Sequence, residues 1–262
     1  MRKKITRKNK LKRLKFLKNY PLISREEQKK LKSLLIISPG LGLNSVILRD
    51  LCRLGIQKFL IADKDKVTLE NLNRQHYTIN QIGKLKTKAT KENLKKINPS
   101  TIVKVFNDFI KINNIENFLE MTQEFKFSDI IVIDGIDPFQ HISVSKILAK
   151  EVLQRGWIYF YPADLGWGSG LVVFTKRNKE KIEKFFGKLP NLKNMANYVK
   201  IHVGFPSYVL KLFQLHSYPQ PITSVLCASV LTINAIMKFI KKKRLPHIQI
   251  FDPLESFYST FY

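Results

Sequence analysis

Cysteines and acidic residues are scarce in this sequence. The chain has 262 residues and only two cysteines, Cys52 and Cys227, which lie too far apart to form a paired-cysteine motif. This pattern excludes a disulfide framework and a zinc site built from CxxC pairs, and it favours a reducing compartment. Acidic residues number 20 against 46 lysines and arginines, so the net charge is +26. A hydrophobic content of 44% nevertheless excludes a mostly disordered polybasic chain.

Long apolar runs are also rare. The first 20 residues contain ten lysines and arginines, but they are not followed by the apolar stretch of about 7 or more residues that a signal peptide requires. We therefore expect a cytoplasmic protein. The most apolar stretch, residues 222–240, is near the low end of membrane-spanning length and contains serine, threonine, asparagine and lysine. These polar residues predict a buried helix and no membrane insertion.

Residues 1–23 are interpreted as a basic N-terminal tail. Leucines spaced three apart in this segment are typical of a basic helix that binds nucleic acid or a membrane surface, but a solvated tail would carry the same charges. The globular part begins at Ser24, which forms a capping box with Glu27 at the start of a short helix. We expect a single domain over residues 24–262.

A nucleotide-binding unit is indicated directly after this helix. The apolar run 34–37 predicts a strand that is buried on both faces. The run leads into Gly40 and Gly42, and a helical pattern follows. The next predicted strand ends in Asp63, about 20 residues after Gly42, where a carboxylate can accept hydrogen bonds from ribose hydroxyls.

The glycine motif itself is incomplete. A full G-x-G-x-x-G needs a third glycine among residues 43–45, which read Leu-Asn-Ser. The residues fit a motif that starts at Gly40 or at Pro39, and both registers stay open. Strand, glycine turn, helix and strand-terminal acid still occur in the order that a nucleotide site requires.

The residues after Asp63 differ from those of a dehydrogenase. Asn71, Arg74 and Gln75 lie close together in the sequence, and Lys86 follows. Arginine offers a planar fork of donors to phosphate, and lysine offers a compact positive charge. A dinucleotide does not need such a clamp, whereas the triphosphate of ATP does.

A second acidic position follows the predicted strand 129–134. Asp137 comes just after this strand and directly before Pro138. Ligands of open parallel sheets bind outside the carboxyl ends of the strands, so Asp137 is a candidate oxygen ligand for Mg²⁺. The same pair is also typical of a helix start, with aspartate as the cap and proline in the first turn. Further predicted elements are a helix at 84–97, a strand at 101–106, a helix at 115–121 and a strand with its exit loop at 157–167.

These residues together resemble the ThiF/MoeB superfamily of ATP-dependent activating enzymes, which is related to ubiquitin-activating enzyme. The similar positions are Asp63, Asp65, Val67, Asn71, Arg74 and Gln75, then Ile82, Gly83 and Lys86, then Ile97, Asn98 and Pro99, and finally Asp134 and Asp137. The resemblance implies an α/β fold of the Rossmann-like ThiF type, with a mainly parallel sheet and helices on both faces.

The resemblance also implies an activity. Such an enzyme binds Mg-ATP and adenylates a carboxylate, typically the C-terminus of a small ubiquitin-like protein or a peptide, and releases pyrophosphate. Arg74, Lys86 and Asp137 would be the catalytic residues, with Lys86 on the α-phosphate and Asp137 on Mg²⁺. Asp63 would hold the ribose hydroxyls. The other implied nucleotide-binding residues are Gly40, Gly42, Asp65, Asn71 and Gln75, of which Asn71 and Gln75 would engage the polyphosphate together with Arg74.

The chain departs from the family pattern in several places. It lacks the four cysteines of the structural zinc site, so no zinc site is expected. Residues 156–223 contain no cysteine, which favours chemistry that ends at the adenylate. Cys52 and Cys227 are interpreted as packing residues. The arginine motif that reaches across a homodimer in relatives has no clear counterpart, and Arg25 is the nearest candidate.

The C-terminal part is expected to contain a crossover and a closing helix. The crossover spans about 175–221, and its lysine-rich part, 176–200, is expected to be mobile and to cover a substrate tail. The closing helix, about 222–240, resembles the helix that helps to form the homodimer in relatives. We therefore expect a homodimer.

Three alternatives stay open. A tRNA-modifying enzyme similar to threonylcarbamoyladenosine dehydratase also activates a carboxylate and lacks the zinc, and the basic composition favours tRNA as a partner. A non-catalytic nucleotide-binding member would bind ATP without releasing pyrophosphate. A nicotinamide oxidoreductase is disfavoured by Arg74, Lys86 and Asp137.

The excess charge is concentrated in a few segments. Residues 1–32 contribute 14 basic and two acidic residues, and most of the rest falls in residues 84–104, 176–200 and 241–244. Among the lysines and arginines, only Arg74 and Lys86 have a predicted phosphate-binding role. The remaining charge indicates an acidic or polyanionic partner that docks on the tail or the crossover.

Overall fold

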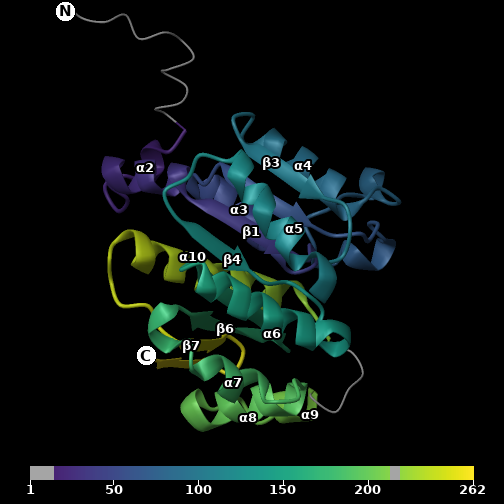
Figure 1. The fold of residues 1–262 in the computed structure, drawn as a ribbon, viewed down its shortest axis with the longest axis vertical. Helices are drawn as coiled ribbons and strands as arrows, with labels where there is room; N and C mark the ends of the chain where they lie inside the picture. Colours follow the sequence, from purple (N-terminus) through teal and green to yellow (C-terminus); the bar gives the residue numbers. More distant parts are fainter. Residues whose placement is uncertain (1–14, 213–218) are drawn as a thin grey trace, which may run out of the picture.

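The computed structural model describes residues 15–212 and 219–262, which form one sheet flanked by helices (Figure 1). The eight strands of the sheet lie in the order β3-β2-β1-β4-β5-β6-β7-β8. The first five strands in this order are parallel, and β5 to β8 pair antiparallel. The strands are β1 Leu35–Pro39, β2 Lys58–Ala62, β3 Ile102–Phe106, β4 Ile130–Ile133, β5 Ile158–Leu165, β6 Gly168–Phe174, β7 Ile248–Asp252 and β8 Phe257–Phe261.

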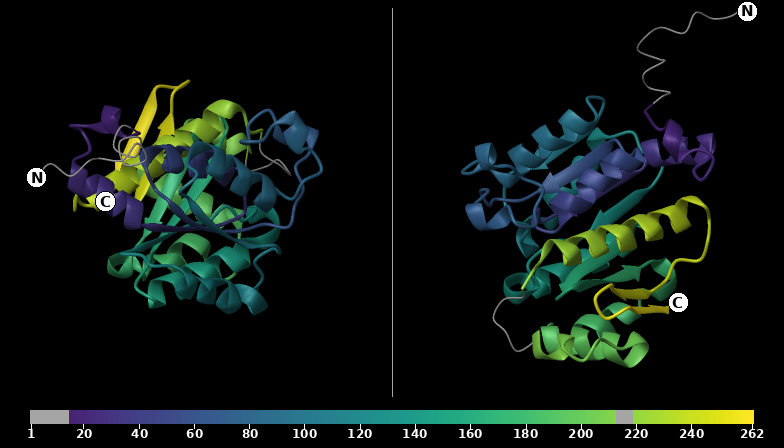
Figure 2. Two further views of the ribbon diagram at one scale, coloured as in Figure 1. Left: turned by 90° about the horizontal axis from the view of Figure 1, so that it is seen from above. Right: turned by 180° about the vertical axis from the view of Figure 1, so that it is seen from behind.

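Helices cover both faces of this sheet (Figure 2). Helices α3, α4 and α10 pack against one face, and α5, α6, α7 and α8 against the other. The helices are α2 Arg25–Ser33, α3 Asn44–Leu54, α4 Lys86–Ile97, α5 Ile115–Glu120, α6 Pro138–Gln154, α7 Lys181–Phe186, α8 Leu192–Val203, α9 Val209–Leu212 and α10 Ile222–Ile240. Short 3-10 turns are η1 Leu17–Asn19, η2 Leu69–Asn71, η3 Ile79–Gln81, η4 Ile112–Asn114, η5 Met121–Glu124 and η6 Lys176–Asn178.

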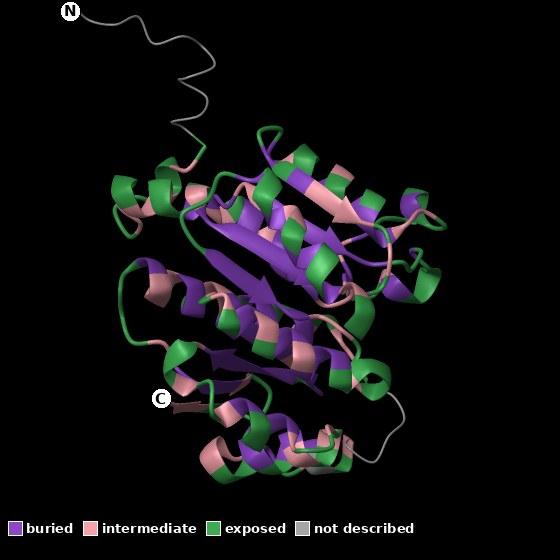
Figure 3. Cartoon of the chain, viewed as in Figure 1, coloured by how far each residue is buried: buried purple, intermediate pink, exposed green. Residues whose placement is uncertain are grey.

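The central strands are apolar on both faces because both faces are covered. Leu35 and Ile37 of β1 belong to the core under α5 and α6, whereas Ile36, between them, belongs to the core under α3 and α10. All three side chains are fully buried, and the sheet centre is the most buried part of the fold (Figure 3). The continuous apolar run thus predicts a central parallel strand correctly. The mainly parallel α/β sheet with helices on both faces is confirmed.

The chain reverses its direction of winding beside β1. From β1 the chain moves outward to β2 and β3, and then returns to place β4 on the other side of β1. The loops after β1 and β4 therefore separate at the carboxyl edge of the sheet, which is where open α/β sheets bind ligands. At this edge the Gly135 N–H donates to the Pro39 carbonyl over 2.9 Å, so the two loops are joined by their backbones.

Most predicted elements are confirmed, with small shifts at their ends. Ser24 and Glu27 form the predicted capping box, and Gly55 ends α3. The closing helix matches residues 222–240. Strand β1 continues through Pro39, which had been assigned to the turn.

The crossover is more regular than expected. Instead of a mobile segment, residues 176–212 contain η6, α7, α8 and α9. Phe185 and Phe186 of α7 are buried and stack edge-on against Tyr161 of β5. This apolar anchoring, placed between lysines in the sequence, explains why a segment with a high charge still folds.

The described part of the N-terminal tail contacts the domain. The Lys15 ammonium donates to the Ile97 carbonyl, and the Asn19 side-chain amide donates to Gln28 of α2. The leucine stripe predicted for the tail lies largely outside the described residues.

Helix α10 is long and apolar enough to span a membrane by length and composition alone, and half of its most apolar window is buried. Ala228, Leu231 and Ala235 pack in the core beside β6 and α3. This burial accounts for the apolar character of the helix, as the prediction of a buried helix requires.

Replacing Gly40 with alanine is expected to destabilise the fold strongly. A Cβ on Gly40 would lie 2.1 Å from the Gly135 carbonyl oxygen, and the Gly40 φ is +75°. We expect the free energy of unfolding to fall by more than about 2 kcal/mol, because both a backbone clash and a left-handed conformation are involved. Urea unfolding measures this change.

Two alanine variants separate these causes. Gly156 has the same φ of +75° but nothing within 4 Å of a built Cβ, so Gly156→Ala reports the backbone strain alone, about 1 kcal/mol. Gly42→Ala meets only the Gln75 side chain at 3.5 Å and should leave stability nearly unchanged. A loss at Gly40 no larger than that at Gly156 would show that the loop contact is unimportant.

Candidate nucleotide site at the carboxyl edge of the sheet

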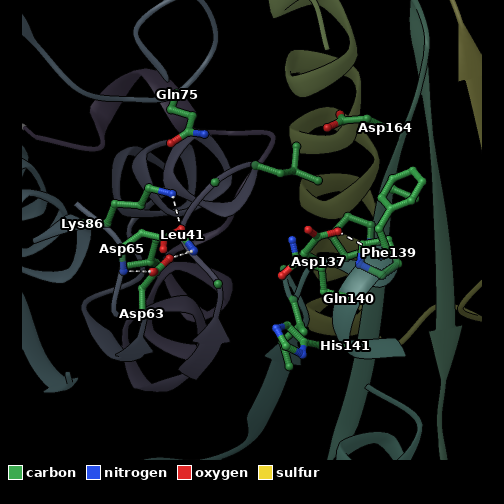
Figure 4. Close-up of a pocket in the computed structure, with 18 of the residues that line it drawn as sticks. Leu41, Asp63, Asp65, Gln75, Lys86, Asp137, Phe139, Gln140, His141 and Asp164 are labelled. Atoms are coloured by element: carbon green, nitrogen blue, oxygen red, sulfur yellow. Dashed lines mark hydrogen bonds and ion pairs between the residues drawn. The ribbon is translucent and has the colours of Figure 1, made fainter. Parts of the chain in front are cut away.

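A cavity of about 590 Å³ opens at the carboxyl ends of the parallel strands. Its lining combines the loops after β1, β2 and β4, the start of α4, the end of β5 and residues 73–75. In Figure 4, Asp63, Asp65 and Lys86 lie on one side of the cavity, and Asp137, Gln140 and His141 lie on the other. Its volume is that of a typical small-molecule site, about 300 to 1,000 Å³.

Asp63 is held in place at the end of β2 by two backbone donors. The Leu41 N–H donates to Oδ2 over 2.7 Å, and the Asp65 N–H donates to Oδ1 over 2.8 Å. Burial raises the pKa of the Asp63 carboxyl, while the nearby Lys86 charge and these hydrogen bonds act in the opposite direction. The carboxylate thereby ties the glycine loop to β2 and borders the cavity.

Lys86 reaches the cavity from the first turn of α4. Its side chain is 9% exposed, and its ammonium pairs with the Asp65 carboxylate over 2.9 Å. The Asp65 side chain is 51% exposed. An almost buried cation is thus paired with a half-exposed carboxylate, so an anionic ligand can take over the cation without leaving a buried charge unpaired.

Arg74 and Gln75 border the cavity, and Asn71 does not. The Arg74 guanidinium donates to the Glu70 carbonyl and to the Asn73 side chain, with no carboxylate partner among the described ion pairs. Gln75 is 8% exposed, and its Oε1 has no hydrogen-bond partner. The Asn71 side-chain oxygen accepts from the Thr68 N–H and caps η2, so Asn71 supports the loop instead of facing the cavity.

Asp137 forms the predicted helix cap and also borders the cavity. It is the N-cap of α6, where Oδ1 accepts from the Phe139 N–H over 3.0 Å and Pro138 occupies the first turn. Its side chain is exposed and lines the cavity. One carboxylate oxygen therefore caps the helix, and the other is available to a ligand.

Asp134, the first acid of the D-x-x-D motif, has a structural role. It is 1% exposed, accepts from the Ile136 N–H, and receives a hydrogen bond from the Tyr159 hydroxyl. Burial raises the pKa of the Asp134 carboxyl to about 6, despite these donors. It orients the loop that carries Asp137 and does not line the cavity.

The missing third glycine is replaced by buried polar side chains. Asn44 donates to the Ser38 hydroxyl and to the Ile133 carbonyl, which links the start of α3 to β4. The Ser45 hydroxyl donates to the Gly42 carbonyl over 2.8 Å. Leu43, the N-cap residue of α3, makes no side-chain cap, and the Ser45 and Val46 N–H groups donate to the Gly42 and Leu43 carbonyls. The positive end of the helix dipole still faces the glycine loop.

The sequence matches the ThiF family over residues 16–259. The chain belongs to the ThiF family. Among curated relatives, a probable molybdopterin-synthase adenylyltransferase of Porphyra purpurea is 31% identical over 66% of this chain and 44% of its own length. Ubiquitin-like modifier-activating enzyme 5 of Culex quinquefasciatus is 35% identical over 48% of this chain and 29% of its own length.

A third relative is named for a tRNA substrate. It is the tRNA threonylcarbamoyladenosine dehydratase of Haemophilus influenzae, which is 35% identical over 37% of this chain and 35% of its own length. The chain thus spans less than half the length of these relatives. Among solved structures, PaaA superposes with a TM-score of 0.63 at 17% identity, and E. coli MccB with ATP at 0.60 and 19%. Both cover 90% of this chain and 65% of their own, and both show the ThiF-type fold.

The cysteines of this ThiF-family chain are packing residues, as predicted. Cys52 is fully buried in the core under α3, and Cys227 is 5% exposed within α10. Burial raises the pKa of both thiols, that of Cys227 to about 11. In the described residues, no group of three or more His, Cys, Asp or Glu side chains is arranged to hold a metal ion.

Asp164 is a site residue that the sequence analysis missed. It lies near the end of β5, is 6% exposed, and its Oδ1 has no hydrogen-bond partner in the described structure. It borders both the main cavity and a small apolar pocket of about 60 Å³ beneath α8. Burial raises the pKa of its carboxyl to about 6, although Ser224 and Arg74 lower it. The available signal was a single acid inside an otherwise apolar strand.

Replacing Asp164 with asparagine is expected to change how stability depends on pH. The Asp164 pKa rises from 3.8 to about 6 on folding, so the folded chain binds more protons between these values, and wild-type stability falls as pH rises through them. Asp164→Asn lacks this loss. Its free energy of unfolding should therefore gain about 1 to 3 kcal/mol on wild type between about pH 4 and pH 7.

Thermal unfolding between pH 4 and pH 8 measures the difference. Asp108→Asn is a control whose difference from wild type should stay constant over this range, since a hydrogen bond from the Phe109 N–H lowers the pKa of that exposed carboxyl below its ordinary value of 3.8. Parallel pH profiles for wild type and Asp164→Asn would contradict the assignment of a strained buried acid.

Proposed function

We propose that this chain catalyses ATP-dependent adenylation of a carboxylate, at the C-terminus of a small ubiquitin-like protein or a peptide. The observation that carries the proposal is the convergence of Arg74, Lys86 and Asp137 on one cavity that Asp63 also borders. These are two cations and a free carboxylate oxygen, as expected for a triphosphate with its metal. Membership of a family with named adenylyltransferases supports the same activity.

The residues around the cavity fit ATP. Asp63 can accept hydrogen bonds from ribose hydroxyls at the end of β2. The positive end of the α3 dipole and the ammonium of Lys86 suit phosphate oxygens. Phe109, Ile110 and Ile136 provide an apolar wall against which a flat base can pack.

Magnesium also fits the residues present. Mg²⁺ is commonly bound through one or two carboxylates together with phosphate oxygens and water. Asp137 would supply the carboxylate, because only one of its oxygens is used by the helix cap. When bound, Mg²⁺ would neutralise charge on the phosphates.

The reaction needs charge stabilisation more than proton transfer. An oxygen of the substrate carboxylate attacks the α-phosphorus, an acyl oxygen–phosphorus bond forms, and the bond from the α-phosphorus to the bridging oxygen breaks to release pyrophosphate. Negative charge on the phosphoryl oxygens grows during this step, and Lys86 and Arg74 are suited to stabilise it. No thiol step is proposed, since both cysteines are buried.

A carboxylate on a modified tRNA is the second candidate substrate. The relative from Haemophilus influenzae is named for a tRNA substrate, and the net charge of +26 suits a polyanion. A member that binds ATP without chemistry would show no pyrophosphate exchange with any partner.

We infer a homodimer from the exposed edge of α10. Ile222, Leu226 and Val230 lie one helical turn apart and are 43%, 41% and 47% exposed, so they form an apolar stripe that a second copy could cover. Leu226→Lys should shift the protein to monomer in analytical ultracentrifugation. Ile112→Lys should not, because Ile112 is 58% exposed in η4, beside α5 and α6 on the other face of the sheet. A monomeric wild type would disprove the homodimer.

Isotope exchange between pyrophosphate and ATP tests the adenylation. With purified ubiquitin-like proteins and peptides as partners, we expect partner-dependent exchange. Asp137→Asn should reduce it about 100-fold, because asparagine keeps the helix cap but loses the charge. Asp129→Asn, at the opposite end of β4, is the matched control and should exchange like wild type.

Two results would reject the proposal. Equal exchange by wild type and Asp137→Asn would remove Asp137 from the catalytic set. ATP binding without exchange, across ubiquitin-like, peptide and tRNA partners, would favour the non-catalytic member.

A further inference from the structure

A second concave surface lies at the opposite end of β5 from the nucleotide site. This basic groove has a volume of about 900 Å³ and is lined by residues 156–158 at the start of β5, residues 175–178 with Lys181, and residues 242–247, together with Val173, Phe239 and Tyr262. Asp164 lies six residues further along β5 than Ile158, about 20 Å at the rise of a strand. The groove is thus separate from the ATP-binding cavity.

The walls of the basic groove carry six cations from two distant segments of the chain. Lys176, Arg177 and Lys181 come from the crossover, and Lys242, Lys243 and Arg244 follow α10. The sequence analysis treated these two segments as separate sources of excess charge. The fold brings them to one groove, whose lining contains no aspartate or glutamate.

None of these six cations has an acidic partner among the described ion pairs, and the fold gathers them at one concave surface. Among the described ion pairs, Lys241 binds Glu27, Lys146 binds Glu183 and Lys84 binds Glu92, but none involves a cation of the basic groove. Five of the six are exposed, namely Lys176, Arg177, Lys242, Lys243 and Arg244. Like charges without counterions repel one another, so binding of a polyanion would relieve an unfavourable interaction.

Two aromatic rings, those of Trp157 and Tyr262, also line the basic groove. The Arg244 guanidinium lies 5.2 Å from the centre of the Tyr262 ring, and the Arg155 guanidinium lies 5.9 Å from that of Trp157. Tyr262 is 45% exposed, and Trp157 is partly exposed. Rings beside a cationic groove are the arrangement by which proteins bind single-stranded nucleic acids, since bases stack on the rings while phosphates meet the cations.

We propose that the basic groove binds a single-stranded polynucleotide through its phosphate backbone. A flat membrane surface would not contact cations on both walls of a groove, and an acidic protein segment would make no use of the aromatic rings. The groove and the adenylation site are independent, so either can fail without the other.

Fluorescence anisotropy with labelled oligo(U) and oligo(dT) of 20 nucleotides tests this proposal with the full chain. The groove variant is Lys242→Glu, Lys243→Glu and Arg244→Glu combined. The control variant, Lys88→Glu, Lys91→Glu and Lys96→Glu combined, makes the same charge change on exposed residues of α4. The circular dichroism spectrum and the pyrophosphate exchange of the groove variant should match those of wild type. This result would show that the variant is folded and that its nucleotide site is intact.

We expect wild type to bind with a slope of log K against log salt of about −4, because six contacts to a single strand each contribute about −0.7. The groove variant should bind at least tenfold more weakly, with about half this slope, and the control variant less than threefold more weakly. Trp157→Ala should weaken binding without changing the slope, because it removes stacking and no charge.

Several outcomes would overturn the proposal. Failure of wild type to bind either oligonucleotide would disprove it. Equal binding by the two triple variants would assign binding to overall charge or to the N-terminal tail. Binding of polyglutamate as tightly as of oligonucleotides would indicate an acidic protein partner. Tighter binding of oligo(U) than of oligo(dT) would support the proposal and identify RNA as the ligand, and equal binding would support it for either polymer.

Discussion

The backbone contact between the loops after β1 and β4 determines the geometry of the nucleotide site. The Gly135 N–H donates to the Pro39 carbonyl over 2.9 Å, and Gly40 approaches Gly135 so closely that neither position can hold a side chain without movement. Asp63 is bonded to the loop on one side of this contact through Leu41, and Asp137 follows it on the other side. The spacing between the Asp63 and Asp137 carboxylates, which we propose hold the ribose and the metal, therefore depends on this backbone contact.

The buried polar residues beside this contact explain how the chain manages without a complete glycine motif. A third glycine normally permits close packing of the first helix on the strand. Here Asn44 crosses from α3 to Ser38 and β4 through two hydrogen bonds of 2.9 Å, so polar bonds replace close packing. In this chain, residues 43–45 carry side chains, and the positions that must lack one are Gly40 and Gly135. The glycine motif alone does not reveal the requirement at Gly135.

The sequence was informative where local patterns carry the structure, and less so where distant segments meet. The capping box of Ser24, the run before Gly40 and the closing helix each depend on neighbouring residues, and all three were predicted. The family resemblance assigned Asn71 to the polyphosphate, whereas in this structure its side-chain oxygen caps its own turn. Asp164 was missed because its partnerless oxygen arises only when β5 is covered by the crossover and α10, and no local pattern encodes that burial.

The distribution of charge separates the nucleotide site from the excess of lysine and arginine. The lining of the ATP-binding cavity contains Asp63, Asp65, Asp137 and Asp164 but only two cations, Arg74 and Lys86. Such a site cannot neutralise a triphosphate by itself, so a divalent metal would be needed there, and a net charge of +26 is of little help to it. The far end of β5 instead borders the basic groove, where six cations and no aspartate or glutamate are found among the described lining residues. Because four acids line one cavity and six cations line the other, the two ends of the same strand present different electrostatic surfaces, one suited to Mg-ATP and the other to a polyanion without a metal.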